Sequence, residues 1–280
     1  MSEYIHGDNI ANKLKNEKNA INKAYLSEIK KCYDNWRDAL SKIKGDSLRA
    51  IKQRTALLNE YKNFIDQPKF RKEKGNPNGF TSQSKLHSTV LEEFMFHLLR
   101  EIPQLKDKKL LYGPTNAYSN LYFAPNNLAT FEHTSGITIN TKNQDFAISK
   151  EVCIETTVTG AKYNEGKTVS VPIVSIECKT YLDKTMYEGS VATAEKIKRG
   201  NPYSLFLIVT ETYEVGPDVD PNYSQIDQIY VLRKKSKSSL EERMSIQEDV
   251  VIDLYRMVAH HVASDWRNIE NRLETGKMVS

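Results

Sequence analysis

Apolar and polar positions follow two periods along this chain, one typical of helices and one typical of strands. Over residues 1–66 the apolar side chains recur at spacings of three and four. That spacing places them on one face of a helix. Gly45-Asp46 interrupts the pattern between two such stretches. Residues 1–66 are therefore predicted to form a helical region containing a hairpin, packed on the core or on a partner.

The pattern changes beyond this helical region. Residues 67–84 are rich in Lys, Gly, Asn and Ser and predict a loop, and 86–102 predict a helix that Pro103 ends. Further helices are predicted at 186–199 and from 240 to about 272. Short apolar runs bounded by turn residues predict strands in between. These runs cover residues 110–112, 118–123, 131–139, 144–149, 152–158, 169–179, 205–209 and 226–232.

The order of these elements indicates the fold class. A leading helix, then strands, a helix and a further strand are typical of a sheet covered by helices. The run 205–209 is apolar throughout, as expected at the centre of such a sheet. We predict an α/β (α+β) fold with a mixed central sheet flanked by helices. Residues 1–66 would be the N-terminal helical region, and residues 67–280 the core with a C-terminal helical segment.

Composition narrows the class of protein. Charged residues make up 27% of the 280 residues and hydrophobic ones 39%, which is typical of a soluble globular chain. No run approaches the roughly 20 apolar residues of a membrane helix, and no secretory signal is expected. Cys32, Cys153 and Cys178 lack metal-type spacing, which favours a reduced, cytoplasmic compartment. The net charge of +4 permits a nucleic-acid partner without requiring one.

An acid and an amine stand side by side at the end of a predicted buried strand. In residues 176–179, alternation puts Glu177 and Lys179 on one face and turns the Cys178 side chain to the core. Buried charges must be paired or must bind something. Asp145 leads an earlier strand. Two carboxylates from neighbouring strands beside a lysine outline a Mg²⁺ site for phosphodiester chemistry.

Each group in this arrangement has an expected role. Mg²⁺ keeps several waters, so Asp145 and Glu177 would suffice as carboxylate ligands, with the backbone carbonyl of Cys178 as a third. The metal would lower the pKa of a bound water, which Lys179 would orient, or Lys179 would stabilise the transition state directly. An ordinary strand-end ion pair is the alternative interpretation. Glu155 is a rival first ligand.

The two strand segments resemble the motifs of the PD-(D/E)XK nuclease superfamily. Gln144-Asp145-Phe146-Ala147-Ile148 is similar to the first motif, with Gln in place of Pro, and Ile176-Glu177-Cys178-Lys179 is similar to the second. Residues 179–186 resemble a segment shared by a group of type II restriction endonucleases. Residues 187–198 most resemble the subunits of BbvCI-type enzymes, which are type IIT and contain two different but related chains. The resemblance is clear over residues 140–210.

This resemblance implies a sequence-specific endonuclease subunit that requires Mg²⁺, with Mn²⁺ expected to substitute. Such a chain would cut one strand of double-stranded DNA at a short asymmetric site and leave a 5′-phosphate and a 3′-hydroxyl. It would work in the bacterial cytoplasm with a related, non-identical second subunit; a homodimer is the alternative for the isolated chain. Parts of the superfamily add a leading-helix glutamate to the site, here Glu92 or Glu93.

Two other functions remain open. A repair or structure-specific nuclease of the same fold would cut without a fixed short site. A catalytically silent DNA-binding protein is the third possibility, but the intact set of Asp145, Glu177 and Lys179 argues against it.

Basic and amide side chains outside these motifs are candidates for contact with DNA. The loop 67–84 would be a flap that contacts phosphates, the turns 115–120 and 125–127 would read base edges, and the end of the helix 186–199 would contact phosphates. A solvated linker, ordinary Asn-rich turns and cations suited to a helix dipole are the plainer explanations. The candidates are Lys69, Arg71, Lys72, Lys74, Asn116, Asn120, Lys196, Lys198 and Arg199.

Overall fold

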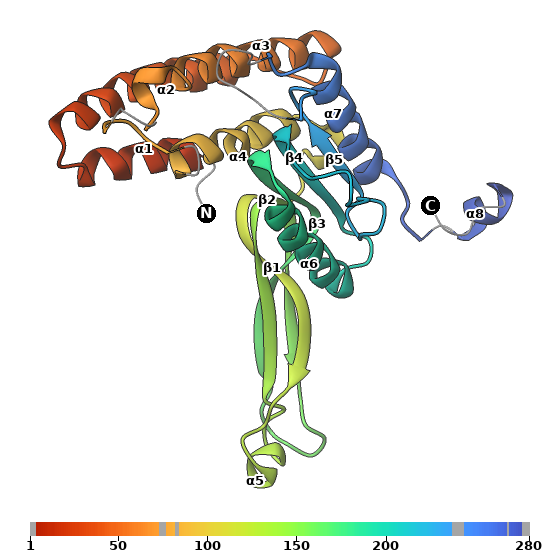
Figure 1. Cartoon of the computed structure of the whole chain (residues 1–280). Coiled ribbons are helices and arrows are strands. Elements are labelled where there is room, and N and C mark those ends of the chain that lie inside the picture. The colour runs from red at the N-terminus through yellow and green to blue at the C-terminus, as the bar shows by residue number, and fades with distance from the viewer. Residues whose placement is uncertain (1–3, 73–76, 82–83, 237–243, 268, 276–280) are drawn as a thin grey trace.

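A body of helices and strands carries a long β arm in the computed structural model of the chain (Figure 1), which describes residues 4–72, 77–81, 84–236, 244–267 and 269–275. The helices are α1 Ile5–Asn16, α2 Ala20–Lys42, α3 Leu48–Ile65, α4 Lys85–Leu99, α5 Leu128–Phe131, α6 Lys184–Gly200, α7 Glu248–Ala263 and α8 Ile269–Thr275. The strands are β1 Leu111–Phe123, β2 Ile137–Thr156, β3 Glu165–Leu182, β4 Leu205–Tyr213 and β5 Gln228–Val231.

The strands form one mixed sheet in the order β1-β2-β3-β4-β5. β2 pairs antiparallel with β1 and with β3, whereas β3, β4 and β5 run parallel. α4 packs against one face together with α7, and α6 packs against the other, where Ala194 and Ile197 meet Phe206 and Ile208. The predicted mixed sheet flanked by helices is confirmed, and β4 lies between two partners as its apolar run predicted.

The helices α2 and α3 begin where the sequence supplies caps. The Asn19 side chain accepts hydrogen bonds from the first amides of α2, and Ser47 accepts one from Ala50 at the start of α3. Between these two helices Gly45 has a φ of +77°, a left-handed conformation that glycine adopts without strain. The predicted hairpin is therefore present as α2 and α3. Their apolar faces join the same hydrophobic cluster as α4 and the sheet.

A buried network of charges ties α3 to the sheet. The ammonium of Lys62 lies 2.7 Å from Glu211 on β4 and 3.3 Å from Asp66. Arg233, just beyond β5, lies 2.8 Å from Glu211, and Arg71 lies 2.6 Å from Asp66. Lys62, Glu211 and Arg233 are almost completely buried. Charges held out of water at this depth require one another, so the network fixes how the helical region sits on the sheet.

The arm consists of the outer parts of β1, β2 and β3, with α5 at its tip (Figure 1). Ser135, just before β2, lies 2.7 Å from the Thr156 hydroxyl at the end of β2 and donates a 3.0 Å hydrogen bond to Glu165. A straight strand of this length would span roughly 65 Å, so β2 turns back on itself. The register shift between Ile148 and Ser149 marks an irregularity in its pairing with β3.

Three sequence predictions were wrong, two of them around this arm. Residues 115–120, predicted as a turn, lie inside β1, because the chain continues through Gly113-Pro114 at a register shift that accommodates the proline. Residues 131–139, predicted as a strand, contain the end of α5, and β2 begins only at Ile137. The predicted C-terminal helix is divided into α7 and α8, and residues 240–243 lie outside the described residues.

Within the part of the chain that the structure describes, none of the helices is both long and apolar enough to cross a bilayer.

Candidate active site

The pairing of β2 with β3 brings Asp145 beside the acid and the amine at the end of β3. Phe146 pairs with Ile176, which places Asp145 next to Glu177 across the ladder. The Lys179 ammonium lies 2.8 Å from Asp145 Oδ2 and 2.7 Å from Glu177 Oε2. The backbone N–H of Cys178 also donates to Asp145 Oδ2, at 2.9 Å. Two carboxylates and one ammonium thus form a compact cluster held by adjacent strands.

Burial and mutual repulsion set the protonation of this cluster. The pKa of Glu177 is raised by burial and by the nearby charge of Asp145. Burial by itself lowers the pKa of Lys179, but the attraction of Asp145 and Glu177 outweighs it, so the net pKa is raised. The lysine therefore remains charged at neutral pH. Its ammonium balances part of the negative charge that the two carboxylates concentrate.

Cys178 has the orientation that the alternation of the strand predicts. Its side chain is buried in the hydrophobic cluster with Ile176 and Val174, and burial raises the pKa of its thiol well above the usual value. The expected ligand role of the Cys178 carbonyl stays a prediction. What the structure shows for this residue is the amide N–H bonded to Asp145.

Glu92, on α4, also lies near the cluster of Asp145, Glu177 and Lys179. It lines a groove together with Asp145, and it is buried to the same extent as Glu177. Burial raises the pKa of Glu92 to about 8, and the charge of Asp145 adds to the effect. Of the two helix glutamates considered from the sequence, Glu92 is therefore the one that faces the cluster.

Glu93 has a different position and different partners. Its carboxylate accepts hydrogen bonds from the amides of His6 at 2.9 Å and Gly7 at 3.2 Å, and from the Tyr33 hydroxyl at 2.8 Å. These contacts fasten the start of α1 to α4. A carboxylate is favourable at the first free amides of a helix. The expectation that Glu93 joins the site does not fit this placement.

Glu155 is also separated from the cluster. It is exposed on the arm and pairs with Gly166, far along β3 from Glu177. The rival ligand suggested by the sequence is therefore not near Asp145, because β2 carries the two acids to different parts of the molecule.

The groove beside Asp145 has a volume of about 490 Å³ and lies between two banks. One bank is formed by α1 and α4, the other by β1 and β2. Its lining residues are Ile5, Asn9, Lys85, Ser88, Thr89, Glu92, Pro114, Thr115, Asn116, Asn143, Gln144 and Asp145. Of the Asn candidates for DNA contact, Asn116 is in this lining and Asn120 is exposed further along β1. The α1 residues were missed by sequence reasoning, because no local pattern relates them to Asp145.

The basic candidates are distributed over several surfaces. Lys69 is paired with Glu28 at 2.6 Å, and Arg71 is paired with the buried Asp66. Lys198 is bound to Asp227 at 2.6 Å. Lys69, Arg71 and Lys198 thus each have an acidic partner within the protein, and a contact between these side chains or the loop 67–84 and phosphates stays a prediction. The remaining basic candidates are Lys72, Lys196 and Arg199, which are exposed, and Lys74, which lies outside the described residues.

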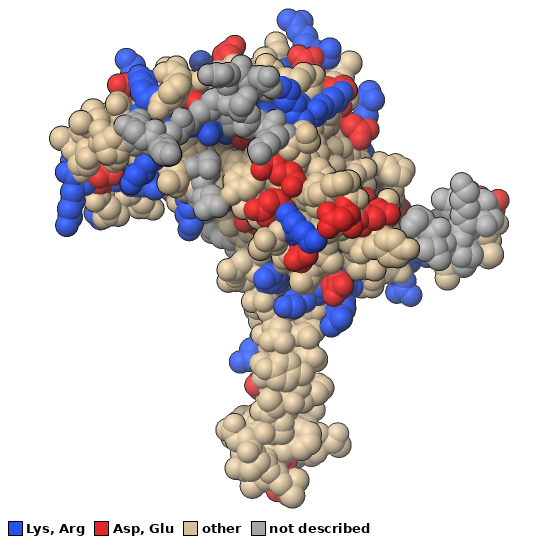
Figure 2. Space-filling model, viewed as in Figure 1, with Lys and Arg blue, Asp and Glu red and all other residues tan. Residues whose placement is uncertain are grey.

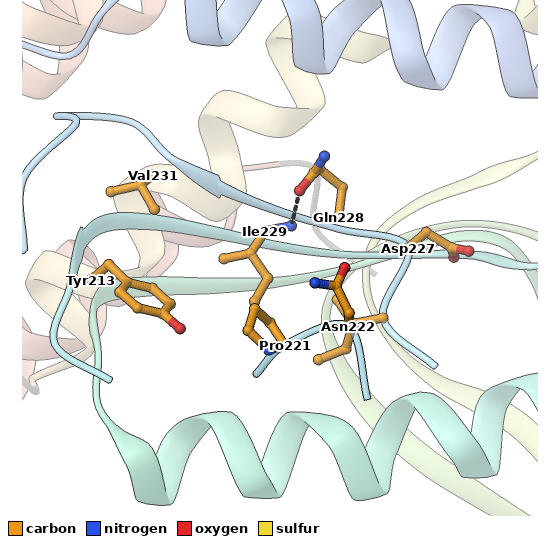
Figure 3. A pocket seen from close by; sticks show the side chains of 8 residues that line it. Tyr213, Pro221, Asn222, Asp227, Gln228, Ile229 and Val231 are labelled. Carbon is orange, nitrogen blue, oxygen red and sulfur yellow. Dashed lines mark hydrogen bonds between the residues drawn. The ribbon is translucent and has the colours of Figure 1, made fainter. Parts of the chain in front are cut away.

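A separate hollow of about 450 Å³ lies beside β5 (Figure 3). Asp227 is the acid in its lining, and this side chain is engaged by Lys198 and by the amide of Phe206 at 2.7 Å. The close-up shows Asp227 at the margin, apart from Tyr213 and Val231. This hollow lacks the paired acids of the groove at Asp145.

The donor set at the cluster suits a hard divalent cation. Over the described residues, no group of three or more His, Cys, Asp or Glu side chains is arranged as a metal centre. Mg²⁺ requires less, because it retains waters and binds through one or two carboxylates. Asp145 and Glu177 are two such carboxylates on adjacent strands, with Glu92 as a further oxygen donor nearby.

The mixed sheet between helices defines an α/β fold of the PD-(D/E)XK type. The chain belongs to the Bpu10I restriction endonuclease family, whose model matches residues 83–275. It is also similar to a solved structure described as the native BbvCI A2B2 tetramer at low resolution, with 18% identity, 99% coverage of both chains and a TM-score of 0.70. At this identity the similarity shows the fold. The comparison with curated proteins returns no match.

Proposed function

We propose that the chain is a catalytic subunit of a type II restriction endonuclease that hydrolyses one strand of double-stranded DNA at a short asymmetric site. The observation that supports this most directly is the cluster of Asp145, Glu177 and Lys179 at the edge of a groove. A surface ion pair would need neither two acids in contact with one ammonium nor a third acid facing them. Family membership makes a nuclease the natural interpretation of this cluster.

The residues present fit Mg²⁺, with Mn²⁺ expected to substitute. Asp145 and Glu177 would hold the cation, joined by the carbonyl of Cys178. When bound, such a cation supplies a water of lowered pKa and neutralises charge that develops on the phosphate. The water oxygen would add to phosphorus as the bond to the 3′-oxygen breaks; the water would release a proton to solvent and the leaving 3′-oxygen would take one up, which leaves a 5′-phosphate and a 3′-hydroxyl.

The protein groups have distinct tasks in this proposal. Lys179 keeps its proton because its pKa is raised, so its ammonium stabilises the negative charge of the transition state. Before a cation binds, Glu92, with a pKa of about 8, is mostly neutral at pH 7 and adds no third charge to the cluster. The Cys178 amide orients Asp145 through its 2.9 Å hydrogen bond.

A second chain is part of the proposal. One such cluster is found among the described residues, and one cluster cuts one strand in one binding pose. An asymmetric DNA site cannot be matched by two identical half-site readers, so a related, non-identical subunit is favoured over a homodimer. The similar BbvCI structure is described as an A2B2 tetramer. The compartment proposed for this assembly is the reduced cytoplasm of a bacterium.

The tip of the arm, on the face that Figure 2 shows, suits contact with another protein. Figure 2 shows it almost without Lys, Arg, Asp or Glu on the face in view. Near its tip, Tyr122, Phe123 and Leu128 are exposed by 46%, 56% and 77%. Exposed apolar side chains gathered at one place favour association with a protein.

The test is digestion of plasmid DNA by the chain co-expressed with its partner, with the ends mapped on each strand. Glu177→Gly in this chain should leave an assembly that nicks one strand at its normal position, because the scaffold and DNA contacts remain. Cleavage of both strands, or of neither, would contradict one site per chain. Ends without a fixed sequence would favour a repair or structure-specific nuclease, and binding without cleavage by the intact assembly would favour a silent DNA-binding protein.

A further inference from the structure

The groove beside Asp145 carries amide side chains on both banks. Asn9 projects from α1 on one bank, and Asn116, Asn143 and Gln144 come from β1 and β2 on the other. Because Asp145 and Glu92 line the same hollow, whatever occupies it lies directly against the carboxylate cluster. The space therefore continues the candidate active site.

Two of these amides each carry a polar atom that no described residue satisfies. Gln144 is only 3% exposed; its Nε2 donates to the Asn143 carbonyl at 2.8 Å, while its Oε1 has no hydrogen-bond partner among the described residues. The Asn9 Nδ2 is shielded and likewise without a partner in the described part of the chain. Buried polar atoms nearly always make a hydrogen bond, and a buried polar atom without one destabilises the native state. Asn9 and Gln144 both line this groove, and a ligand in it that offers a donor and an acceptor would complete their hydrogen bonds.

The position of Asn9 is fixed by the body of the protein. Glu93 receives the amides of His6 and Gly7, so the first turn of α1 is held to α4. His6 is itself buried and bonded to Tyr61 at 2.6 Å. A polar group held in place before its ligand arrives binds with a smaller loss of conformational entropy.

We propose that this groove holds the nucleotide next to the phosphodiester that is cut, with Asn9 and Gln144 hydrogen-bonded to it. This inference rests on the proposed nuclease function. A nucleotide has donor and acceptor atoms on its base edge and acceptors on its sugar and phosphate, and carboxamides read such groups without adding charge. Lys85 and Ser88 on the α4 bank suit the adjoining phosphate. Gln144 stands where the first motif has proline, so in this chain that position would supply a hydrogen bond to the nucleotide.

The experiment compares Asn9→Ala, Gln144→Met and the double variant in the assembly co-expressed with its partner. Gln144→Met preserves the length of the side chain and removes its polar atoms. Asn12→Ala is the matched control, because Asn12 is exposed on the same helix and does not line the groove. The values of kcat/KM on a duplex carrying the mapped site are measured, with melting temperatures to confirm folding.

Each groove variant should lower kcat/KM by roughly 5- to 100-fold, the discrimination typical of a single polar interaction with DNA. Asn12→Ala should stay within about twofold. The double variant should lose less than the product of the single losses, because both side chains bind one nucleotide. If Gln144→Met melts at a lower temperature, Asn9→Ala carries the test alone, since Asn9 is not a core residue.

A library of duplexes randomised in and around the site identifies the atoms contacted. Relaxed discrimination at one position means a base-edge contact, and uniform weakening means a sugar or phosphate contact; both support the proposal. Normal kcat/KM for Asn9→Ala overturns it, whether or not Gln144→Met folds. Failure of the unmodified assembly to cut DNA, or normal cutting by Glu177→Ala, would overturn the proposed function instead.

Discussion

Glu92 should make the stability of this protein fall as the pH rises. Its pKa is about 8 in the folded chain against an ordinary value of 4.5, chiefly because it is buried and secondly because Asp145 is near. Between these two values the native state keeps a proton that the unfolded state releases. Since the unfolded state then binds fewer protons, the free energy of unfolding decreases with rising pH.

The size of the effect follows from the shift. One pKa unit corresponds to about 1.4 kcal/mol, so the free energy of unfolding should lose roughly 3–4 kcal/mol between pH 5 and pH 8 on account of Glu92 alone. Glu92→Gln removes the titrating group and preserves its shape. The variant should therefore lack this part of the pH dependence, and should be more stable than the natural chain at pH 8.

Urea unfolding at several pH values, followed by circular dichroism, measures the difference. Glu93→Gln is a control with the opposite sign, because that neighbouring carboxylate accepts hydrogen bonds from α1 and Tyr33; it should lower stability at pH 6 by about 1–3 kcal/mol. Added Mg²⁺ should raise the stability of the natural chain at pH 8, since a cation near Glu92 favours its charged form. Equal pH dependence of the natural chain and Glu92→Gln would refute the reasoning.

Three other predictions concern charges described above. Lys179→Ala and Lys179→Arg should each lower the single-turnover rate by at least roughly 100-fold with little change in DNA affinity, because a planar guanidinium does not replace a compact ammonium between two acids; an active Arg variant would argue for a mere surface cation. Lys62→Met should lower the free energy of unfolding by about 3–5 kcal/mol in urea, since Glu211 would lose a buried partner, and a loss well below about 1 kcal/mol would contradict this. Neutralising Lys69 and Lys72 together should reduce the log–log salt slope of DNA binding by about 0.9 for each phosphate that these lysines neutralise, and an unchanged slope would show that residues 67–84 are a linker.

The local pattern of apolar and polar residues was enough to predict the helices and strands whose burial follows that pattern. The helix predicted at 186–199 corresponds to α6, and the run 205–209 corresponds to the start of β4. β4 extends to Tyr213 because Thr210 and Thr212 are paired with β3, which buries polar residues that no apolar count would include. The alternation of side chains likewise predicted which way Cys178 points.

Features created by distant parts of the chain could not be predicted in the same way. Glu92 and Glu93 are neighbours on one helix and both are buried, yet one faces Asp145 and the other binds α1. Nothing in the local sequence distinguishes them, because their difference arises from where α1 docks. The return of β2 along the arm, which removes Glu155 from the cluster, is also a consequence of contacts between distant segments such as Ser135 and Thr156.

The buried pair of Lys62 and Glu211 limits how this protein could be recombined with relatives. Cutting the chain after residue 66 looks convenient in the sequence, since a loop follows. A chimaera joined there would inherit Lys62 from one parent and Glu211 and Arg233 from the other. Where the second parent lacks the matching charges, the hybrid would bury an ion without its counterion. Exchanging residues 1–66 between relatives therefore requires that Glu211 and Arg233 be transferred as well, and both follow that segment by more than a hundred residues.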